Sequence, residues 1–441
     1  MNSVDIDAGQ IAGWVRDARG RTFELVEDLT DEKLRVPLLE IVNPFLWEIG
    51  HVAWFQEHWV LRHVARTPPL LDGVGALYDS AAVQHDTRWD LALPTRDETR
   101  EYMTAVRESV LSRLGDGDLG ERETYFNLLS VFHEDMHGEA FMYMRQTLGY
   151  PMPSLTGCAF DAGRAGKAAR PEGDAEVPGG MLDLGTTPNA PFVFDNEQWA
   201  HPVEIEPFAI ARTPVTQGEF AAFVDDGGYR RRELWCDEGW RWRESADAEQ
   251  PVYFFRGGDG ESRWQRRHFD RLFPLEPDRP VIHVNGYEAD AYCRWAGRRL
   301  PTEPEWEAAA AAEPTATGDR LAARKRRYPW GHEPPDPARA NLDARTMDTV
   351  GVGALPAGDS AFGCRQMLGN VWEWTDSVFR PYPGFEPGPY KEYSEPWFEK
   401  RKVLRGGAWA TRSRMIQNTY RNYFPPDRRD VFAGFRTCRL R

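Results

Sequence analysis

Residues 123–148 carry a repeating pattern of apolar side chains that strongly restricts how this segment can fold. Apolar or aromatic residues recur at intervals of three and four, which places them along one face of an α-helix. These residues are Tyr125, Leu128, Leu129, Phe132, Met136, Ala140, Phe141 and Met144. His133 and His137 lie inside the same stripe. We therefore expect both imidazoles to point into the interior of a helical domain.

Three further stretches of the N-terminal third show helical periodicity: residues 8–28, a segment that begins after Pro44, and residues 97–115. Proline is tolerated in the first turn of a helix. Four amphipathic helices predict an antiparallel bundle, whose core is a usual place for a metal site built from facing helices. His51 lies next to the apolar stripe of the second helix, and His58 follows two turns later on nearly the same face. Both histidines are candidates for a third ligand.

The sequence HEDMH (133–137) allows two interpretations. As an H-E-x-x-H helix it matches the zinc peptidases, with Glu134 as general base. As an inward-facing histidine pair joined by a third imidazole, it would form a three-histidine centre. Zinc with three histidines keeps one water, as in hydrolases, whereas octahedral iron keeps about half of its shell open for substrates or dioxygen. Because no further ligand follows HEDMH in the same helix-turn context, the peptidase interpretation is disfavoured. We expect Glu134 to be an ordinary, partly exposed carboxylate.

Chain length and composition predict two domains. A chain of 441 residues exceeds what one hydrophobic core usually supports. Residues 157–180 are rich in Gly, Ala and charge without a period, which is typical of a linker. The predicted domains are therefore residues 1–156 and 181–441. The second shows short segments separated by Gly, Pro, Asp and Asn, with helices expected around 216–224, 287–295 and 303–312.

The charge pattern restricts the partners of the protein. Its formal net charge is −15, and the acidic residues are dispersed, which argues against nucleic acid or an anionic membrane surface as a partner. No window approaches the roughly 18 uninterrupted apolar residues of a membrane-spanning helix, and the N-terminus lacks a signal-peptide pattern. We expect a cytoplasmic protein. Five cysteines without a CxxC pair suggest mostly buried thiols rather than disulfides or a zinc knuckle.

Several motifs of the second half occur together in one known family. They are PVTQGEFAAFVDDGGY (214–229), NGYEADAYCRWAGRRLPTEPEWEAAA (285–310), GNVWEW (369–374), LRGGAW (404–409) and GFR (434–436). This set resembles the sulfatase-modifying-factor family, whose formylglycine-generating-enzyme fold is a variant of the C-type lectin fold. The resemblance covers roughly residues 178–441. Formylglycine generation needs a cysteine pair for copper after RGG, and residues 408–424 contain no cysteine, so we do not expect that activity.

The two halves together resemble the non-heme iron sulfoxide synthases of ergothioneine biosynthesis. The resemblance implies an α+β protein, with an N-terminal DinB-like four-helix bundle followed by the C-type-lectin-like domain. The iron ligands of that family, one early histidine and an HxxxH pair, map onto His51, His133 and His137, and Fe(II) is the implied cofactor. A structural Ca²⁺ in the second domain is a further expectation. A carbohydrate-binding or structural role would need only the second domain and would leave the three histidines unexplained.

The first substrate implied by the resemblance is hercynine, the trimethylated betaine of histidine, which receives sulfur at imidazole carbon 2. Its quaternary ammonium group donates no strong hydrogen bond, so aromatic faces and carbonyl dipoles must hold it. By resemblance, Tyr382, Asn422 and Tyr423 line the hercynine pocket. No residue is assigned as a catalytic acid or base.

Four departures from the sulfoxide-synthase pattern concern the second substrate. Met136 replaces the glutamine of HxxQH, Phe379 lies near the position of a tyrosine regarded as proton donor, and Phe424 replaces the aspartate of Asn-Trp-Asp. Residues 78–94 replace the arginine-rich loop that binds the carboxylates of γ-glutamylcysteine. All four changes favour a donor without amino-acid charges.

Residues 43–59 and 78–89 resemble the selenoneine synthase branch of the family, which joins hercynine to a selenosugar. Tyr423 and Phe424 offer aromatic faces on which a neutral sugar can stack. We therefore predict that the protein uses dioxygen to form a carbon–selenium bond between hercynine and a selenosugar. The alternative is an ergothioneine-type synthase that uses γ-glutamylcysteine or cysteine.

Overall fold

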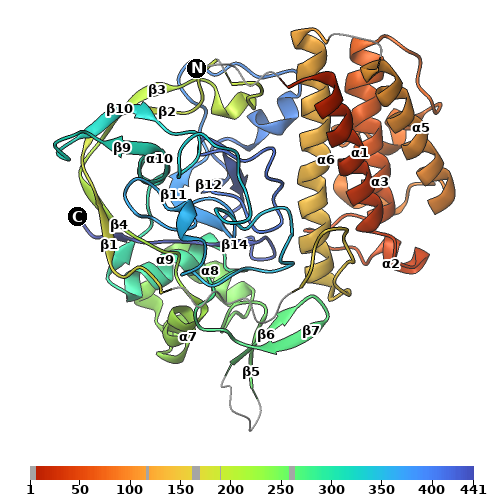
Figure 1. Ribbon diagram of the computed structural model, residues 1–441. Coiled ribbons are helices and arrows are strands. Elements are labelled where there is room, and N and C mark those ends of the chain that lie inside the picture. Colours follow the sequence, from red (N-terminus) through yellow and green to blue (C-terminus); the bar gives the residue numbers. More distant parts are fainter. Residues whose placement is uncertain (1–5, 116–118, 161–168, 189, 258–263) are drawn as a thin grey trace. The chain divides into compact units, whose positions relative to one another are not determined.

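The computed structural model describes residues 6–115, 119–160, 169–188, 190–257 and 264–441 (Figure 1). The chain divides into two compact units. The first consists of Met1–Gly157 together with Asn189–Phe192, and the second of Cys158–Pro188 together with Val193–Arg441. The first unit is helical, and the second combines short helices with several small sheets.

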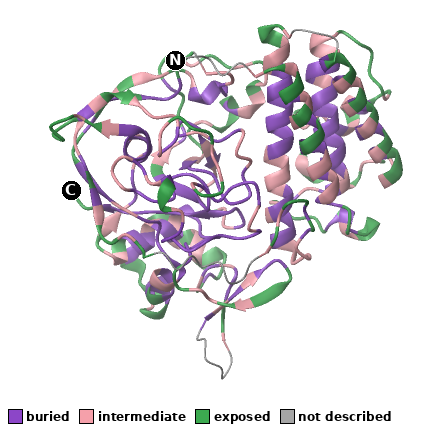
Figure 2. Cartoon of the chain, in the orientation of Figure 1, coloured by how far each residue is buried: buried purple, intermediate pink, exposed green. Residues whose placement is uncertain are grey.

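Four long helices form the first unit, as the periodicity predicts (Figure 1). They are α1 (Ala8–Glu24), α3 (Phe45–Gln56), α5 (Arg96–Leu114) and α6 (Glu121–Leu148). Shorter elements lie between them: α2 (Asp31–Arg35), a π-helix that continues α3 (Glu57–Val64), α4 (Val74–Tyr78) and a 3₁₀ turn (His85–Trp89). Figure 2 shows buried residues along the faces that the long helices turn toward one another.

Local signals explain where α1 and α5 begin. The side chain of Asp7 accepts a hydrogen bond from the backbone of Gln10 at the start of α1. At the start of α5, Thr95 and Glu98 form a reciprocal capping box. Such caps satisfy backbone N–H groups that have no partner inside the helix. The starts of these two helices therefore depend on residues close in sequence.

The second unit contains two four-stranded sheets, with strand orders β1-β4-β15-β8 and β13-β12-β11-β14. The first is formed by β1 (Asp174–Val177), β4 (Phe208–Ala211), β8 (Arg298–Arg299) and β15 (Cys438–Arg439). The second is formed by β11 (Trp372–Val378), β12 (Lys402–Arg405), β13 (Asn422–Phe424) and β14 (Ala433–Gly434). Smaller sheets pair β2 (Gly180–Leu184) with β3 (His201–Ile205), β9 (Ala312–Pro314) with β10 (Leu321–Lys325), and β5 (Phe254–Arg256) with β6 (Trp264–His268) and β7 (Arg271–Pro274).

The three helices predicted in the second half are present, and a fourth was not anticipated. They are α7 (Gln217–Asp225), α9 (Gly286–Trp295) and α10 (Glu303–Ala311), with α8 (Asp237–Ser245) as the addition. Strand β1 and the first residue of β2 lie inside residues 157–180, which the sequence predicted as a linker. β1 pairs with β4 in antiparallel register. The second half of that stretch is thus part of a sheet, because pairing with a distant strand supplies order that local composition does not show.

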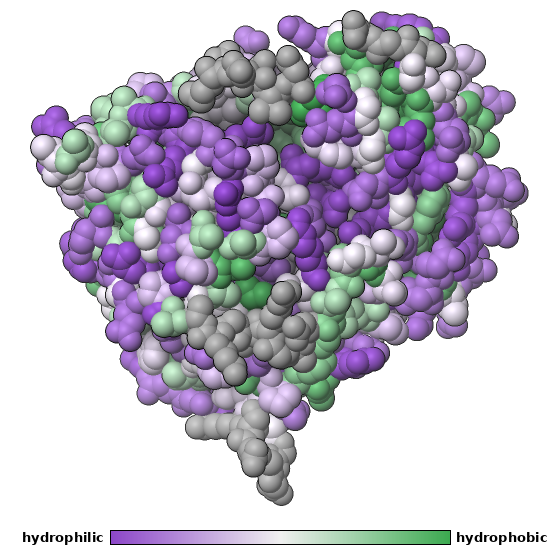
Figure 3. Space-filling view, viewed as in Figure 1, coloured by the Kyte–Doolittle hydropathy of each residue, from purple (hydrophilic) through white to green (hydrophobic). Residues whose placement is uncertain are grey.

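Among the described residues, few large apolar side chains are exposed. Figure 3 shows a largely hydrophilic face with scattered hydrophobic groups. Within the described part of the chain, no helix combines the length and the apolar character needed to cross a membrane.

The sequence motifs of the second unit meet in its core. Arg436 of GFR binds Glu373 of GNVWEW through two hydrogen bonds of 2.6 and 2.7 Å. The indole of Trp306 donates to the same carboxylate at 2.8 Å. All three side chains are fully buried. These motif residues therefore hold the fold together.

We predict that Glu373→Gln lowers the free energy of unfolding by about 3–5 kcal/mol, because it leaves the Arg436 charge buried without a counter-charge. Chemical denaturation of the purified protein measures the change. Glu399→Gln is the control, since Glu399 pairs with Arg380 at the surface and should cost less than about 1 kcal/mol. Equal effects of the two substitutions would contradict a structural role for the buried pair.

Candidate metal centre

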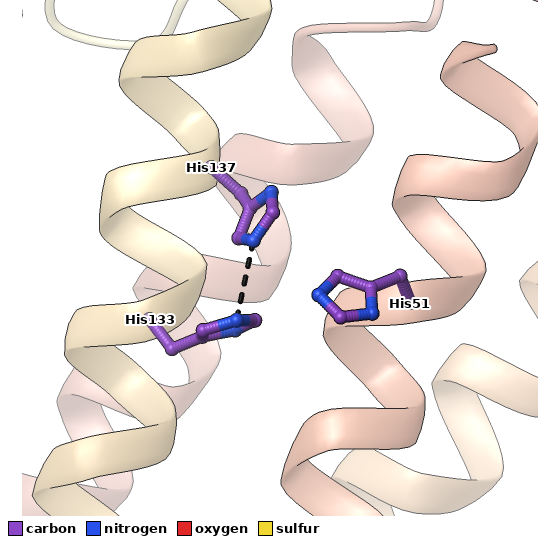
Figure 4. Close-up of side chains that lie close together, drawn as sticks. All are labelled: His51, His133 and His137. Atoms are coloured by element: carbon purple, nitrogen blue, oxygen red, sulfur yellow. Dashed lines mark hydrogen bonds between the residues drawn. The ribbon is translucent and has the colours of Figure 1, made fainter. Parts of the chain in front are cut away.

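Three histidines converge between two helices of the first unit. His51 comes from α3, and His133 and His137 come from successive turns of α6 (Figure 4). Ligand nitrogens of all three lie within 4.8 Å of one another. No other group of three or more His, Cys, Asp or Glu side chains comes so close together in the described residues. The calcium site expected in the second domain remains a prediction.

The spacing suits one shared ion. Nε2 of His133 lies 3.2 Å from Nε2 of His137. Two nitrogens bound to one metal at about 2.1 Å lie about 3.0–3.4 Å apart, for angles between octahedral and tetrahedral. The α-helix produces this pairing, because residues four apart lie above one another on one face.

Two of the imidazoles are oriented by hydrogen bonds that leave Nε2 available to a metal. Nδ1 of His51 donates to the carbonyl of Tyr78 at 2.8 Å. Nδ1 of His137 donates to Oε1 of Glu48 at 2.7 Å. A carbonyl or carboxylate can only accept, so the proton lies on Nδ1 and the Nε2 lone pair remains for a metal. The ring of His133 is held differently, stacked on Phe55 with centroids 3.6 Å apart.

Glu48 and Tyr78 were not predicted from the sequence to contribute to the site. For Glu48 a signal existed, because a carboxylate three residues before His51 stands in an otherwise apolar stretch of the same helix. For Tyr78 no signal existed, since its backbone carbonyl makes the contact.

Burial sets the protonation states. It lowers the pKa of His51 to about 3, with the neighbouring His137 adding to the effect. Burial also lowers the pKa of His133 well below its usual value. Both imidazoles are therefore neutral at physiological pH, which is the form that binds metals.

The donor set fits a divalent cation. Burial alone would raise the pKa of Glu48, but the adjacent His137 brings it below the usual value, so this carboxylate is ionised. Its second oxygen, Oε2, is buried without a hydrogen-bond partner. The imidazoles of His51 and His133 are neutral and Glu48 is negative, so a cation at the centre would balance the buried negative charge.

The environment of Glu134 differs from the expected one. It is buried, not partly exposed, and it forms a salt bridge with Arg19 of α1. The guanidinium donates to both carboxylate oxygens, at 2.8 and 3.1 Å, and Thr22 donates to one of them at 2.8 Å. A carboxylate held in this way does not serve as the base that a zinc peptidase requires.

His58 does not join the histidine cluster. It lies at the start of the π-helix that follows α3, where its ring contacts Trp54 and Trp59 at centroid distances of 5.2 and 4.9 Å. The geometry therefore selects His51 over His58 as the third member.

The residues predicted to bind substrate lie in both units. Met136 is half-buried on α6, in the sequence between His133 and His137. Phe379 and Tyr423 stack on each other at 3.9 Å within a buried cluster. Asn422 and Phe424 are half-buried at the two ends of β13. Their contacts with a substrate remain predictions.

Tyr382 is buried and donates a hydrogen bond to Glu303 at 3.3 Å. Arg421, which the sequence analysis did not identify, lies 4.1 Å from the ring centre of Tyr382 and 4.8 Å from that of Phe379. The structure thus brings Phe379, Tyr382 and Tyr423 into one aromatic region around Arg421.

Known proteins resemble this chain along nearly its whole length. The model of the sulfatase-modifying factor enzyme 1-like domain matches residues 161–440, and that of the DinB superfamily matches residues 15–141. A hercynine oxygenase of Mycolicibacterium thermoresistibile is 40% identical over 436 residues, 97% of this chain and 94% of its own. A hercynine oxygenase of Mycobacterium tuberculosis is 38% identical over 438 residues, 97% of this chain and 98% of its own.

Among solved structures, PvdO from Pseudomonas aeruginosa matches 60% of this chain and 93% of its own, with 23% identity and a TM-score of 0.41.

The fold and the family models define the class of this protein, in which a DinB-like helical domain is joined to a sulfatase-modifying-factor domain. Within this class, the chain belongs to the family of the hercynine oxygenases, which are oxygen-dependent oxidoreductases.

We predict that His51→Ala abolishes high-affinity binding of a divalent metal, because two imidazoles alone hold such an ion weakly. His58→Ala should bind metal like the wild type. Anaerobic titration with Fe(II), followed by metal analysis of the desalted protein, distinguishes the two variants. Loss of metal in the His58 variant with retention in the His51 variant would reverse the ligand assignment.

A second prediction concerns the support of His137. Glu48→Gln keeps a side-chain acceptor for Nδ1 but removes the negative charge, and we expect metal affinity to fall about 10- to 100-fold. The same anaerobic titration measures the change, with circular dichroism as a check on folding. An unchanged affinity would show that the Glu48 charge does not contribute to metal binding.

Proposed function

We propose that this protein uses an iron(II) ion held by His51, His133 and His137, together with dioxygen, to attach a chalcogen donor to imidazole carbon 2 of hercynine. The observation that carries the proposal is the cluster of three imidazoles without a carboxylate ligand, which leaves about half of an octahedral shell open. Bound iron(II) would supply the binding and reduction of dioxygen. The near-full-length similarity to hercynine oxygenases supports hercynine as the first substrate.

The proposed reaction is balanced by one dioxygen molecule. The C–H bond at imidazole carbon 2 and the Se–H or S–H bond of the donor break, and a carbon–selenium or carbon–sulfur bond forms. One oxygen atom becomes the selenoxide or sulfoxide oxygen. The other leaves as water with the two hydrogens.

We propose a selenosugar as the donor. Residues 78–94 contain one arginine, Arg88, which lies 3.8 Å from the ring centre of Trp47. Arg88 also donates hydrogen bonds to Asn43 at 2.7 Å and to the carbonyl of Val83 at 3.3 Å. A guanidinium engaged in this way is not available to bind donor carboxylates, and this favours a donor without them. The apolar side chains at Met136 and Phe424 agree with this preference.

An ergothioneine-type reaction, with γ-glutamylcysteine or cysteine as donor, is the second candidate. The similarity to the hercynine oxygenases supports it equally, because that similarity concerns hercynine and not the donor.

The decisive experiment loads the protein anaerobically with Fe(II) and adds hercynine, dioxygen and one donor at a time. We expect an oxygen-dependent hercynine adduct with the selenosugar, identified by mass spectrometry, and none with the His51→Ala variant. A product with γ-glutamylcysteine or cysteine alone would overturn the selenium assignment. If no donor gives an oxygen-dependent product and hercynine is not consumed, the proposed reaction is wrong.

A further inference from the structure

We infer that residues 74–89 are a positioning element for His51, so that the metal centre reaches full affinity only when this segment is docked on α3. The segment comprises α4, the turn after it and the 3₁₀ turn that ends at Trp89. Because this inference rests on the metal centre proposed above, its test must separate a failure of the centre from a failure of the positioning role.

The first connection is a pair of backbone carbonyls at the end of α4. The carbonyl of Tyr78 accepts from Nδ1 of His51 at 2.8 Å, and that of Leu77 accepts from Nε1 of Trp47 at 2.7 Å. Trp47 and His51 lie one turn apart on the same face of α3. Two adjacent carbonyls therefore hold two adjacent side chains of the helix.

Gly50 permits this docking. A Cβ atom at Gly50 would lie 2.3 Å from two ring carbons of Tyr78, a distance that real contacts do not reach. Tyr78 is fully buried, so its ring cannot move aside freely. Glycine inside a helix costs about 0.5–1 kcal/mol relative to alanine. The close approach of α4 to α3 accounts for a glycine at this position.

The second connection passes through an aromatic ring. The indole of Trp47 stacks on the imidazole of His51, with centroids 4.8 Å apart and planes 10° apart. The guanidinium of Arg88, at the far end of the segment, lies 3.8 Å from the centre of the Trp47 ring. Arg88 is also tied to Asn43, just before α3 begins. Cation–π contact and hydrogen bonding together hold Trp47 against the ligand.

The two connections have a common chemical consequence. The Tyr78 carbonyl keeps the proton of neutral His51 on Nδ1, and the Trp47 ring limits rotation of the imidazole. Without the carbonyl, the proton can move to Nε2, which is the nitrogen that faces the other two histidines. The same segment includes most of residues 78–94, which replace the donor-binding loop of the sulfoxide synthases.

Gly50→Ala tests the inference with Co(II) as an anaerobic probe of the three-histidine site. We expect Co(II) affinity to fall about 10- to 100-fold and the visible absorption of the bound ion to change, because His51 is no longer held in place. Gly13→Ala in α1 is the matched control, since a Cβ there meets nothing within 4 Å. The control should bind Co(II) like the wild type.

Arg88→Met provides a second variant that leaves the helices untouched. It keeps the length of the side chain but removes the charge and the hydrogen bonds, and weaker Co(II) binding is again expected. Its control is Arg100→Met, because Arg100 lies over Phe23, a ring that is not part of the histidine cluster, at 4.8 Å. In the metal-free proteins, ¹⁵N NMR of His51 should show the Nδ1–H tautomer for the wild type and a mixture for the two test variants.

The outcomes distinguish a failure of the metal centre from a failure of the positioning role. If the wild type does not bind Co(II), the metal centre itself is wrong. If the wild type binds and both test variants match it in affinity, absorption and tautomer, the positioning role of residues 74–89 is overturned. If Gly50→Ala does not fold, Arg88→Met decides alone.

Discussion

The packing of α3 against α6 is the constraint on which the first unit depends, because the facing surfaces of these helices carry imidazoles inside an apolar bundle. A buried polar group is costly unless each of its polar atoms finds a partner. For His51 and His137 the partners are a backbone carbonyl and a carboxylate of the same unit. Satisfying Nδ1 in this way directs Nε2 toward the other helix, and the cluster follows.

The buried carboxylates of the bundle are compensated in different ways. Glu134 is neutralised by Arg19, and Glu57 accepts hydrogen bonds from Tyr102 and the backbone of Leu70. Among the described residues, Glu48 has its hydrogen bond with His137, an imidazole that carries a positive charge only when protonated. It is therefore the buried charge that a divalent ion at the centre would balance. The Arg19–Glu134 ion pair therefore contributes to folding, whereas Glu48 contributes to the three-histidine site.

The second unit shows why family motifs identify a fold better than a reaction. Glu373, Arg436 and Trp306 come from three separate motifs and meet in one buried group. Glu303 likewise binds both Arg405 and Arg421. Such residues are needed wherever this loop-rich scaffold occurs, whatever chemistry it supports. The metal centre proposed for this chain lies in the helical unit.

The sequence by itself determined the four long helices and the pairing of His133 with His137, because both depend on contacts between residues three or four apart. It left the third ligand open between His51 and His58. The tertiary structure decided that choice in favour of His51, because two helical turns place His58 about 10 Å further along the helix axis, where its ring contacts Trp54 and Trp59 instead of the cluster. It also decided the roles of Glu134, Glu48 and Tyr78. Their partners come from segments far apart in the chain, and periodicity within one helix carries no information about them.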